Sequence, residues 1–135
     1  MAHLQHKHII VRADVYKPPA KDSPHQLELW FKDLIESINM KILTGPYVVY
    51  CDMPGNKGFT GICAIETSHI ALHMWEEQLP GRFELDVYTC GDLDASIIFD
   101  KIKIFDPINV QYLILDRQEG QIVVDQGTLQ LASAA

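Results

Sequence analysis

Residues Glu66 to Trp75 read E-T-S-H-I-A-L-H-M-W, and this stretch decides how the chain folds. Apolar side chains alternate with other side chains along it, as they do in a β-strand that is buried on one side only. The two alternating sets are Ile70, Leu72 and Met74, and His69, Ala71, His73 and Trp75. The first set predicts a core-facing surface, so the two histidines and the tryptophan are expected on the opposite face.

The same period of two continues on both sides of this stretch, between Lys41 and Gly91. Turn residues interrupt it at P-G-N-K-G (54 to 58) and Q-L-P-G (78 to 81). The pattern predicts antiparallel strands at about 45 to 52, 59 to 66, 68 to 76 and 82 to 90. In the last of these, Phe83, Leu85 and Val87 alternate with Glu84, Asp86, Tyr88 and Cys90.

A helix is predicted from about Pro24 to Met40. Ser23 is a typical N-cap residue, Pro24 suits the first helical position, and Gln26 follows the serine by three residues. Apolar residues then recur every three or four positions, at Leu27, Trp30, Phe31, Leu34, Ile35 and Ile38. This periodicity indicates one apolar helix face.

The remaining elements are a second helix and three strands. Asp92 or Asp94 can cap the helix, which is expected to end before Asp106-Pro107. The strands are expected at 8 to 16, 110 to 116 and 122 to 125. This order predicts an α+β fold, a two-layer α/β sandwich in which two helices cover one face of an antiparallel sheet. At 135 residues the chain fits one domain, residues 1 to 135.

Composition narrows the possible partners and the compartment. The net charge is −7, with 11 basic against 18 acidic residues, so nucleic acid is not an expected partner. No apolar run approaches the ~20 residues that span a bilayer, so no integral membrane protein is expected. Three cysteines and an N-terminus without an apolar signal core indicate a reduced, cytoplasmic setting. The tract His3, His6 and His8 suggests weak metal binding, or simply the start of a strand.

The face that the helices do not cover carries an unusual set of side chains: two histidines, Trp75, Tyr88, Cys90 and acids. It is too aromatic for bare solvent, which favours a dimer interface, a ligand site, or both. A homodimer is the simplest expectation because a two-fold interface is the commonest one. Spacing alone leaves open whether these residues are catalytic or structural.

Two segments resemble the bacterial and archaeal S-adenosylmethionine decarboxylase family, whose members are pyruvoyl-dependent, self-processing proenzymes. They are G-I-C-A-I-E-T-S-H-I-A-L-H-M-W-E-E at 61 to 77 and L-D-V-Y-T-C-G at 85 to 91. The resemblance lies in a Ser-His pair, a histidine five residues after the serine, a tryptophan, a glutamate, and a following D-V-aromatic-T-C-G segment. Their joint occurrence in this order is more specific than any single motif.

The resemblance implies that the chain is cut between Thr67 and Ser68. Ser68 would attack the Thr67 carbonyl, and its remnant would become the pyruvoyl cofactor, which forms a Schiff base with the substrate amine; no metal is implied. His73 would act as the processing base and Thr60 as the processing hydroxyl. Cys90 would be the proton donor in turnover. The implied substrate-binding residues are Glu77, His69 and Trp75.

The implied function is decarboxylation of S-adenosylmethionine for spermidine biosynthesis by a cytoplasmic homodimer. Two alternatives remain open: a family homologue that decarboxylates another amino acid, such as ornithine or arginine, and an uncleaved, non-catalytic binding or interaction homologue. Departures from the family pattern keep them open. Thr67 stands where members generally have glutamate, Glu76 where they have proline, and Pro54 where they have an aromatic residue.

Overall fold

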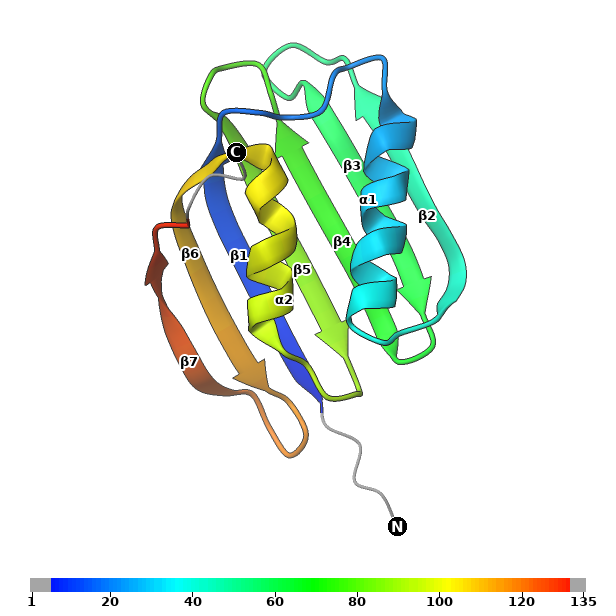
Figure 1. Cartoon of the computed structure of the whole chain (residues 1–135), viewed down its shortest axis with the longest axis vertical. Coiled ribbons are helices and arrows are strands. Elements are labelled where there is room, and N and C mark those ends of the chain that lie inside the picture. Colours follow the sequence, from blue (N-terminus) through cyan, green and yellow to red (C-terminus); the bar gives the residue numbers. More distant parts are fainter. Residues whose placement is uncertain (1–5, 132–135) are drawn as a thin grey trace.

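A computed structural model describes residues 6–131 as one seven-stranded antiparallel sheet with both α-helices on the same side (Figure 1). The elements are β1 (Lys7–Val15), α1 (Pro24–Ser37), β2 (Ile42–Cys51), β3 (Gly58–Ile65), β4 (Ser68–Trp75), β5 (Gly81–Thr89), α2 (Ala95–Ile102), a 3₁₀ turn η1 (Lys103–Phe105), β6 (Pro107–Asp116) and β7 (Ile122–Leu129). The strand order is β2-β3-β4-β5-β1-β6-β7. The predicted two-layer α+β sandwich is confirmed.

The core lies between the sheet and the two helices. Ile70, Leu72 and Met74 of β4 are at most 1% exposed, whereas His69 is exposed and Trp75 is half-buried. On β5, Phe83, Leu85 and Val87 are buried, while Glu84, Asp86 and Tyr88 remain half-buried. The period of two therefore assigned the two faces of both strands correctly.

Helix α1 begins at Pro24 as predicted but ends at Ser37 rather than Met40. Asn39 takes a left-handed conformation (φ 59°), which stops the helix. Ser23 occupies the N-cap position, yet its side chain makes no capping hydrogen bond. The helix packs closely on the sheet at Gly61, where an added Cβ would lie 2.5 Å from the Phe31 ring.

Helix α2 is capped by Asp94, not Asp92, because the Asp94 carboxylate accepts a hydrogen bond from the Ser96 N–H at 3.0 Å. The indole N–H of Trp30 donates to the Lys101 carbonyl at 2.9 Å and so joins the two helices. The left-handed Asp106 (φ 51°) then ends η1 and directs the chain into β6. The predicted end of this helical region is therefore correct.

The strands near both edges of the sheet are longer than the sequence predicts. Strand β2 begins at Ile42 instead of residue 45, β6 begins at Pro107 instead of Val110, and β7 continues to Leu129 instead of Asp125. Strands β6 and β7 extend the sheet past α2 (Figure 1). No helix within residues 6–131 is both long enough and apolar enough to cross a membrane.

Candidate active site

The predicted cleavage point lies in a tight hairpin turn between β3 and β4. Glu66 and Thr67 form the turn, and Ile65 faces Ser68 as the first cross-strand pair. Ser68 has φ 153°, a value that residues other than glycine rarely adopt. The backbone is therefore strained at the serine that follows the predicted cleavage bond.

The Thr67 carbonyl is held by the neighbouring strand. The Cys90 backbone N–H donates a hydrogen bond to the Thr67 carbonyl oxygen at 2.9 Å. The Thr67 hydroxyl donates to the Met40 sulfur at 3.0 Å and lies 3.3 Å from the Thr89 hydroxyl. The Thr67–Ser68 peptide is therefore fixed from two directions, with Cys90 beside its carbonyl.

Thr60 and His73 form a separate pair at a distance from Ser68. They face each other across β3 and β4, with Thr60 Oγ1 3.3 Å from His73 Nδ1, and the His73 ring stacks on Trp75 at 5.4 Å. A strand rises 3.2–3.4 Å per residue, so the five residues from Ser68 to His73 span about 16 Å. Within one chain, therefore, His73 does not reach Ser68.

Glu77 and Trp75 lie at the same end of the sheet as His73. A Glu77 carboxylate oxygen accepts a hydrogen bond from the Gly55 N–H at 3.0 Å, and the Trp75 indole donates to the Asn56 side chain at 2.8 Å. Both residues line a cavity of about 500 Å³, together with Asp14 and Arg82. Thr60 and His73 line a second cavity of about 180 Å³, which shares Trp75 with the first. Apart from His69, the candidate site residues thus form two groups: a cleavage group (Thr67, Ser68 and Cys90) and a pocket group (Thr60, His73, Trp75 and Glu77).

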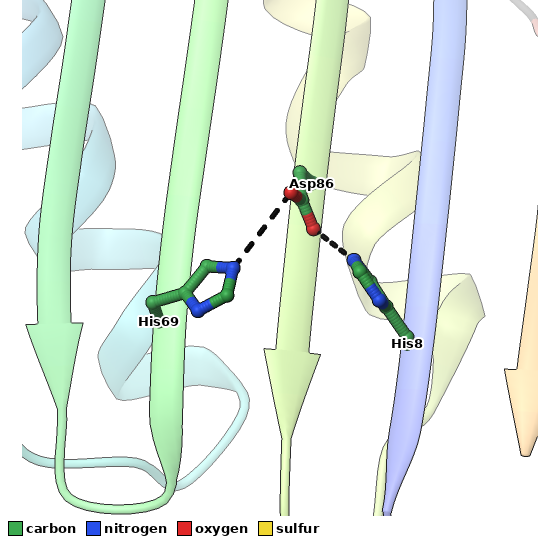
Figure 2. A group of neighbouring side chains, drawn as sticks. All are labelled: His8, His69 and Asp86. Atoms are coloured by element: carbon green, nitrogen blue, oxygen red, sulfur yellow. Dashed lines mark hydrogen bonds and ion pairs between the residues drawn. The ribbon is translucent and has the colours of Figure 1, made fainter. Parts of the chain in front are cut away.

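His69 belongs to a third cluster, which joins three neighbouring strands. His8 of β1, His69 of β4 and Asp86 of β5 point toward one another on the open face (Figure 2). His8 Nε2 bonds to one Asp86 oxygen, and His69 Nε2 lies 3.7 Å from the other. Burial opposes ionisation of Asp86, but the hydrogen bond from His8, together with His69, holds its pKa below the ordinary value.

These three side chains offer potential metal ligands within 4.8 Å of one another, but their surroundings favour hydrogen bonding. Arg117 Nη1 lies 3.1 Å from His8 Nδ1. A guanidinium only donates, so Nδ1 must accept and the His8 proton belongs on Nε2, the atom that bonds to Asp86. A metal-binding histidine has the opposite arrangement: one nitrogen is free for the ion, and the other donates its N–H to an acceptor. The cluster therefore fits a hydrogen-bond network better than a metal centre.

Sequence reasoning did not single out His8, Asp86 and Arg117 as site residues. The period of two placed Asp86 on the open face, and His8 was noticed only as part of the tract His3, His6 and His8. His3 lies outside the described residues, while His6 and His8 contact different partners, Cys90 and Asp86. No sequence signal links Arg117 to β1, because that contact depends on the pairing of β1 with β6.

Comparison with known proteins agrees with the resemblance seen at residues 61 to 77 and 85 to 91. The model of the S-adenosylmethionine decarboxylase family matches residues 7–118. An S-adenosylmethionine decarboxylase proenzyme from Picrophilus torridus is 32% identical over 114 residues, which cover 82% of each chain. A proenzyme from Pyrococcus furiosus is 29% identical over 85 residues, or 63% of this chain and 57% of that protein.

A solved structure resembles the fold over almost its whole length. The crystal structure of the adenosylmethionine decarboxylase from Aquifex aeolicus superposes with a TM-score of 0.65 and covers 93% of this chain and 99% of that one, at 21% identity. At that identity the likeness concerns the fold, while the family model and the P. torridus relative concern the sequence. The chain belongs to the S-adenosylmethionine decarboxylase family, a family of carboxy-lyases.

Proposed function

We propose that this chain is a proenzyme that cuts itself between Thr67 and Ser68 and then decarboxylates S-adenosylmethionine. The observation that carries the proposal is the Thr67–Ser68 turn, in which a strained serine follows a carbonyl that is already hydrogen-bonded to Cys90. Strain at the serine favours a reaction that relieves it. The names of the family and of the P. torridus relative supply the substrate.

Self-cleavage begins when Ser68 Oγ attacks the Thr67 carbonyl carbon and the carbonyl oxygen takes on negative charge. The Cys90 N–H is within hydrogen-bond distance of that oxygen, at 2.9 Å, and can stabilise the charge. The peptide C–N bond then breaks to leave an ester. Removal of the Ser68 Cα proton expels the Thr67 carboxylate, and hydrolysis of the resulting enamine releases ammonia. The new chain start is a pyruvoyl group, which supplies an electron sink for loss of carbon dioxide.

The base for the Cα proton must come from elsewhere, because His73 of the same chain is about 16 Å away along β4. We infer that two chains associate through their open faces. A two-fold axis that lies between the faces and runs across the strands would bring the pocket group of each chain to the cleavage group of the other. Exposed apolar side chains on this face support burial against a second copy; they are Ile10, Tyr47, Val49 and Ile62.

The pocket group would then hold the substrate beside the partner's Ser68 remnant. One Glu77 oxygen is occupied by the Gly55 N–H, which leaves the other to accept hydrogen bonds from substrate hydroxyls. The carboxylates of Glu77 and Asp14 line the same cavity and would attract a sulfonium cation. Cys90 would return a proton to the substrate carbon that has lost its carboxylate. The product would serve spermidine biosynthesis in the cytoplasm.

A mass spectrum tests the cleavage, and labelled substrates test the turnover. We expect the 15.3 kDa chain to yield two fragments that separate between Thr67 and Ser68. Labelled carbon dioxide should come from S-adenosylmethionine and not from ornithine or arginine. If the purified chain stays intact, the second candidate, an uncleaved binding homologue, replaces the proposal. One observation favours that candidate: Thr67 is β-branched, and its hydroxyl is tied to Met40 and Thr89.

A further inference from the structure

A contact outside the roles assigned so far joins Cys90 to the start of β1. Cys90 Sγ lies 3.5 Å from His6 Nδ1, and both side chains are half-buried on the open-face side of the sheet. An imidazole within hydrogen-bond distance of a thiol can take up or return its proton. The Cys90 backbone is in turn bonded to the Thr67 carbonyl, so the pair lies beside the predicted cleavage bond.

His6 is held at this place by the segment that follows β6. The Arg117 backbone N–H donates to the His6 carbonyl at 2.7 Å. The Arg117 guanidinium lies over the Tyr88 ring at 4.4 Å, and Tyr88 stacks on His8 at 5.0 Å. These contacts fix the backbone of His6 although it precedes the first strand.

We propose that His6 is a positioning residue that exchanges a proton with the Cys90 thiol. This inference rests on the proposed function for its role in turnover. Cys90 Sγ–H gives its proton to the substrate carbon and becomes a thiolate. The protonated His6 imidazole then returns a proton to Sγ, and water restores the proton on His6. No oxidant or further reactant is required.

Several charged groups surround the pair and affect its proton balance. Asp116 pairs with Lys7 at 3.3 Å, and the charge of His6 is one of the smaller causes that lower the pKa of Asp116, after hydrogen bonds from Gln118 and Lys7. Asp116 therefore contributes a negative charge near the pair, and Lys7 and Arg117 contribute positive charges. Farther along the open face, His8 stacks on Tyr88 and bonds to Asp86, which also pairs with His69.

Thiol alkylation tests the pair without any need for decarboxylation. The full chain carrying Ser68→Ala, which cannot form the pyruvoyl group, is treated with iodoacetamide between pH 6 and 10, and each cysteine peptide is followed by mass spectrometry. We expect His6→Gln to slow alkylation of Cys90 by about tenfold near pH 7, because a thiolate reacts and glutamine cannot accept the thiol proton. At the alkaline end the two rates should converge, since the thiol then ionises without help.

The chain offers matched controls. His25→Gln removes an exposed histidine on α1 and should leave the Cys90 rate unchanged. Cys63 reports folding, because it is 2% exposed and burial raises the pKa of its thiol, so it should stay unreactive in every folded variant.

The inference would be overturned if, with Cys63 still protected, the Ser68→Ala chain had the same pH–rate curve for Cys90 alkylation with and without His6→Gln. A faster Cys90 reaction at every pH would also overturn it, since His6 would then be only a steric shield. If the unmodified chain, which retains Ser68, fails to cleave itself, the proposed function fails while the alkylation result stands. In a cleaving chain, His6→Gln should shift the pH profile of turnover and leave the cleavage rate unchanged.

Discussion

Thr60 and His73 face each other across β3 and β4, with Thr60 Oγ1 3.3 Å from His73 Nδ1, yet both lie five residues along their strands from the Ile65–Ser68 pair. A hydroxyl and an imidazole in contact form a unit that can hold and move a proton. In one chain that unit has no access to the Ser68 Cα proton. The split between pocket group and cleavage group therefore supports the proposal that two copies complete each other.

Complementation between two inactive variants should restore cleavage. Ser68→Ala lacks the reacting hydroxyl, and His73→Ala lacks the base, so neither is expected to cleave alone. In a mixed dimer, the His73→Ala chain keeps Ser68 and Cys90 and receives Thr60 and His73 from the Ser68→Ala chain. Mass spectrometry of a coexpressed pair should show cleavage of the His73→Ala chain only.

The outcomes of this mixing experiment separate the possible arrangements. An uncleaved mixture that still forms dimers would contradict a site shared between chains. If the His73→Ala chain is expressed without the second variant and still cleaves at more than about a hundredth of the parent rate, His73 is not the base, since general bases contribute roughly 10²–10⁴-fold.

Thr67→Ala should cleave faster than the parent chain by a few-fold. The β-branched side chain of Thr67 crowds its own carbonyl. Thr67→Val is the matched control, because it keeps the branch and loses only the hydroxyl. It should cleave as slowly as the parent and lose about 1 kcal/mol of unfolding free energy. Equal cleavage of all three chains would show that the branch does not limit the reaction.

Gly61→Ala should destabilise the fold by about 1–3 kcal/mol. Its new Cβ would lie 2.5 Å from the Phe31 ring, in the layer where α1 packs on β3. Gly120→Ala is the control, since no atom lies within 4 Å of the corresponding Cβ, and its effect should stay within about 0.5 kcal/mol. Urea unfolding of the two variants provides the comparison, and equal midpoints would show that the helix layer adjusts freely.

The sequence predicted the sheet faces well because alternation in β4 and β5 is a local property of the chain. It was less successful where one residue decides a boundary. Asn39 ends α1 in a left-handed conformation without the glycine that usually signals such an end. Asp92 and Asp94 were equivalent as caps until the contact with Ser96 distinguished them.

The candidate site shows the same division between local and long-range information. The proximity of Thr67 to Cys90 follows from hairpin pairing of β3, β4 and β5, which the turns predict. The separation of Ser68 from His73 was also present in the sequence, since five strand residues already span about 16 Å. By contrast, the contacts of His8 with Asp86 and Arg117 require β1 to lie between β5 and β6, a crossover that no local pattern specifies.

Zinc should neither stabilise the chain nor be retained by it. The ligand atoms of His8, His69 and Asp86 lie within 4.8 Å, but Arg117 holds His8 in the tautomer whose Nε2 donates to Asp86. Thermal unfolding with added Zn²⁺ and with a chelator should therefore give the same midpoint. In Arg117→Ala, His8 Nδ1 no longer has to accept a hydrogen bond, so it can carry the proton and leave Nε2 free for an ion. A zinc-dependent rise in the unfolding midpoint is therefore most expected in this variant. A rise of several degrees in the parent chain would identify the cluster as a metal site.

Asp86→Asn should remove part of the acid sensitivity of the fold. The folded pKa of Asp86 lies below its unfolded value of about 3.9, so its contribution to stability is complete above that value and is lost as the pH falls through the folded pKa. The parent should therefore exceed Asp86→Asn in unfolding free energy at pH 7 and lose that advantage below about pH 4. The difference should be about 1 kcal/mol or less, because the Asp86 side chain is 38% exposed and water screens the pair.

Asp22→Asn, at an exposed position, is the control and should show no such pH-dependent difference. A deficit in Asp86→Asn that persists undiminished at pH 3 would show that Asp86 acts through packing rather than through its charge.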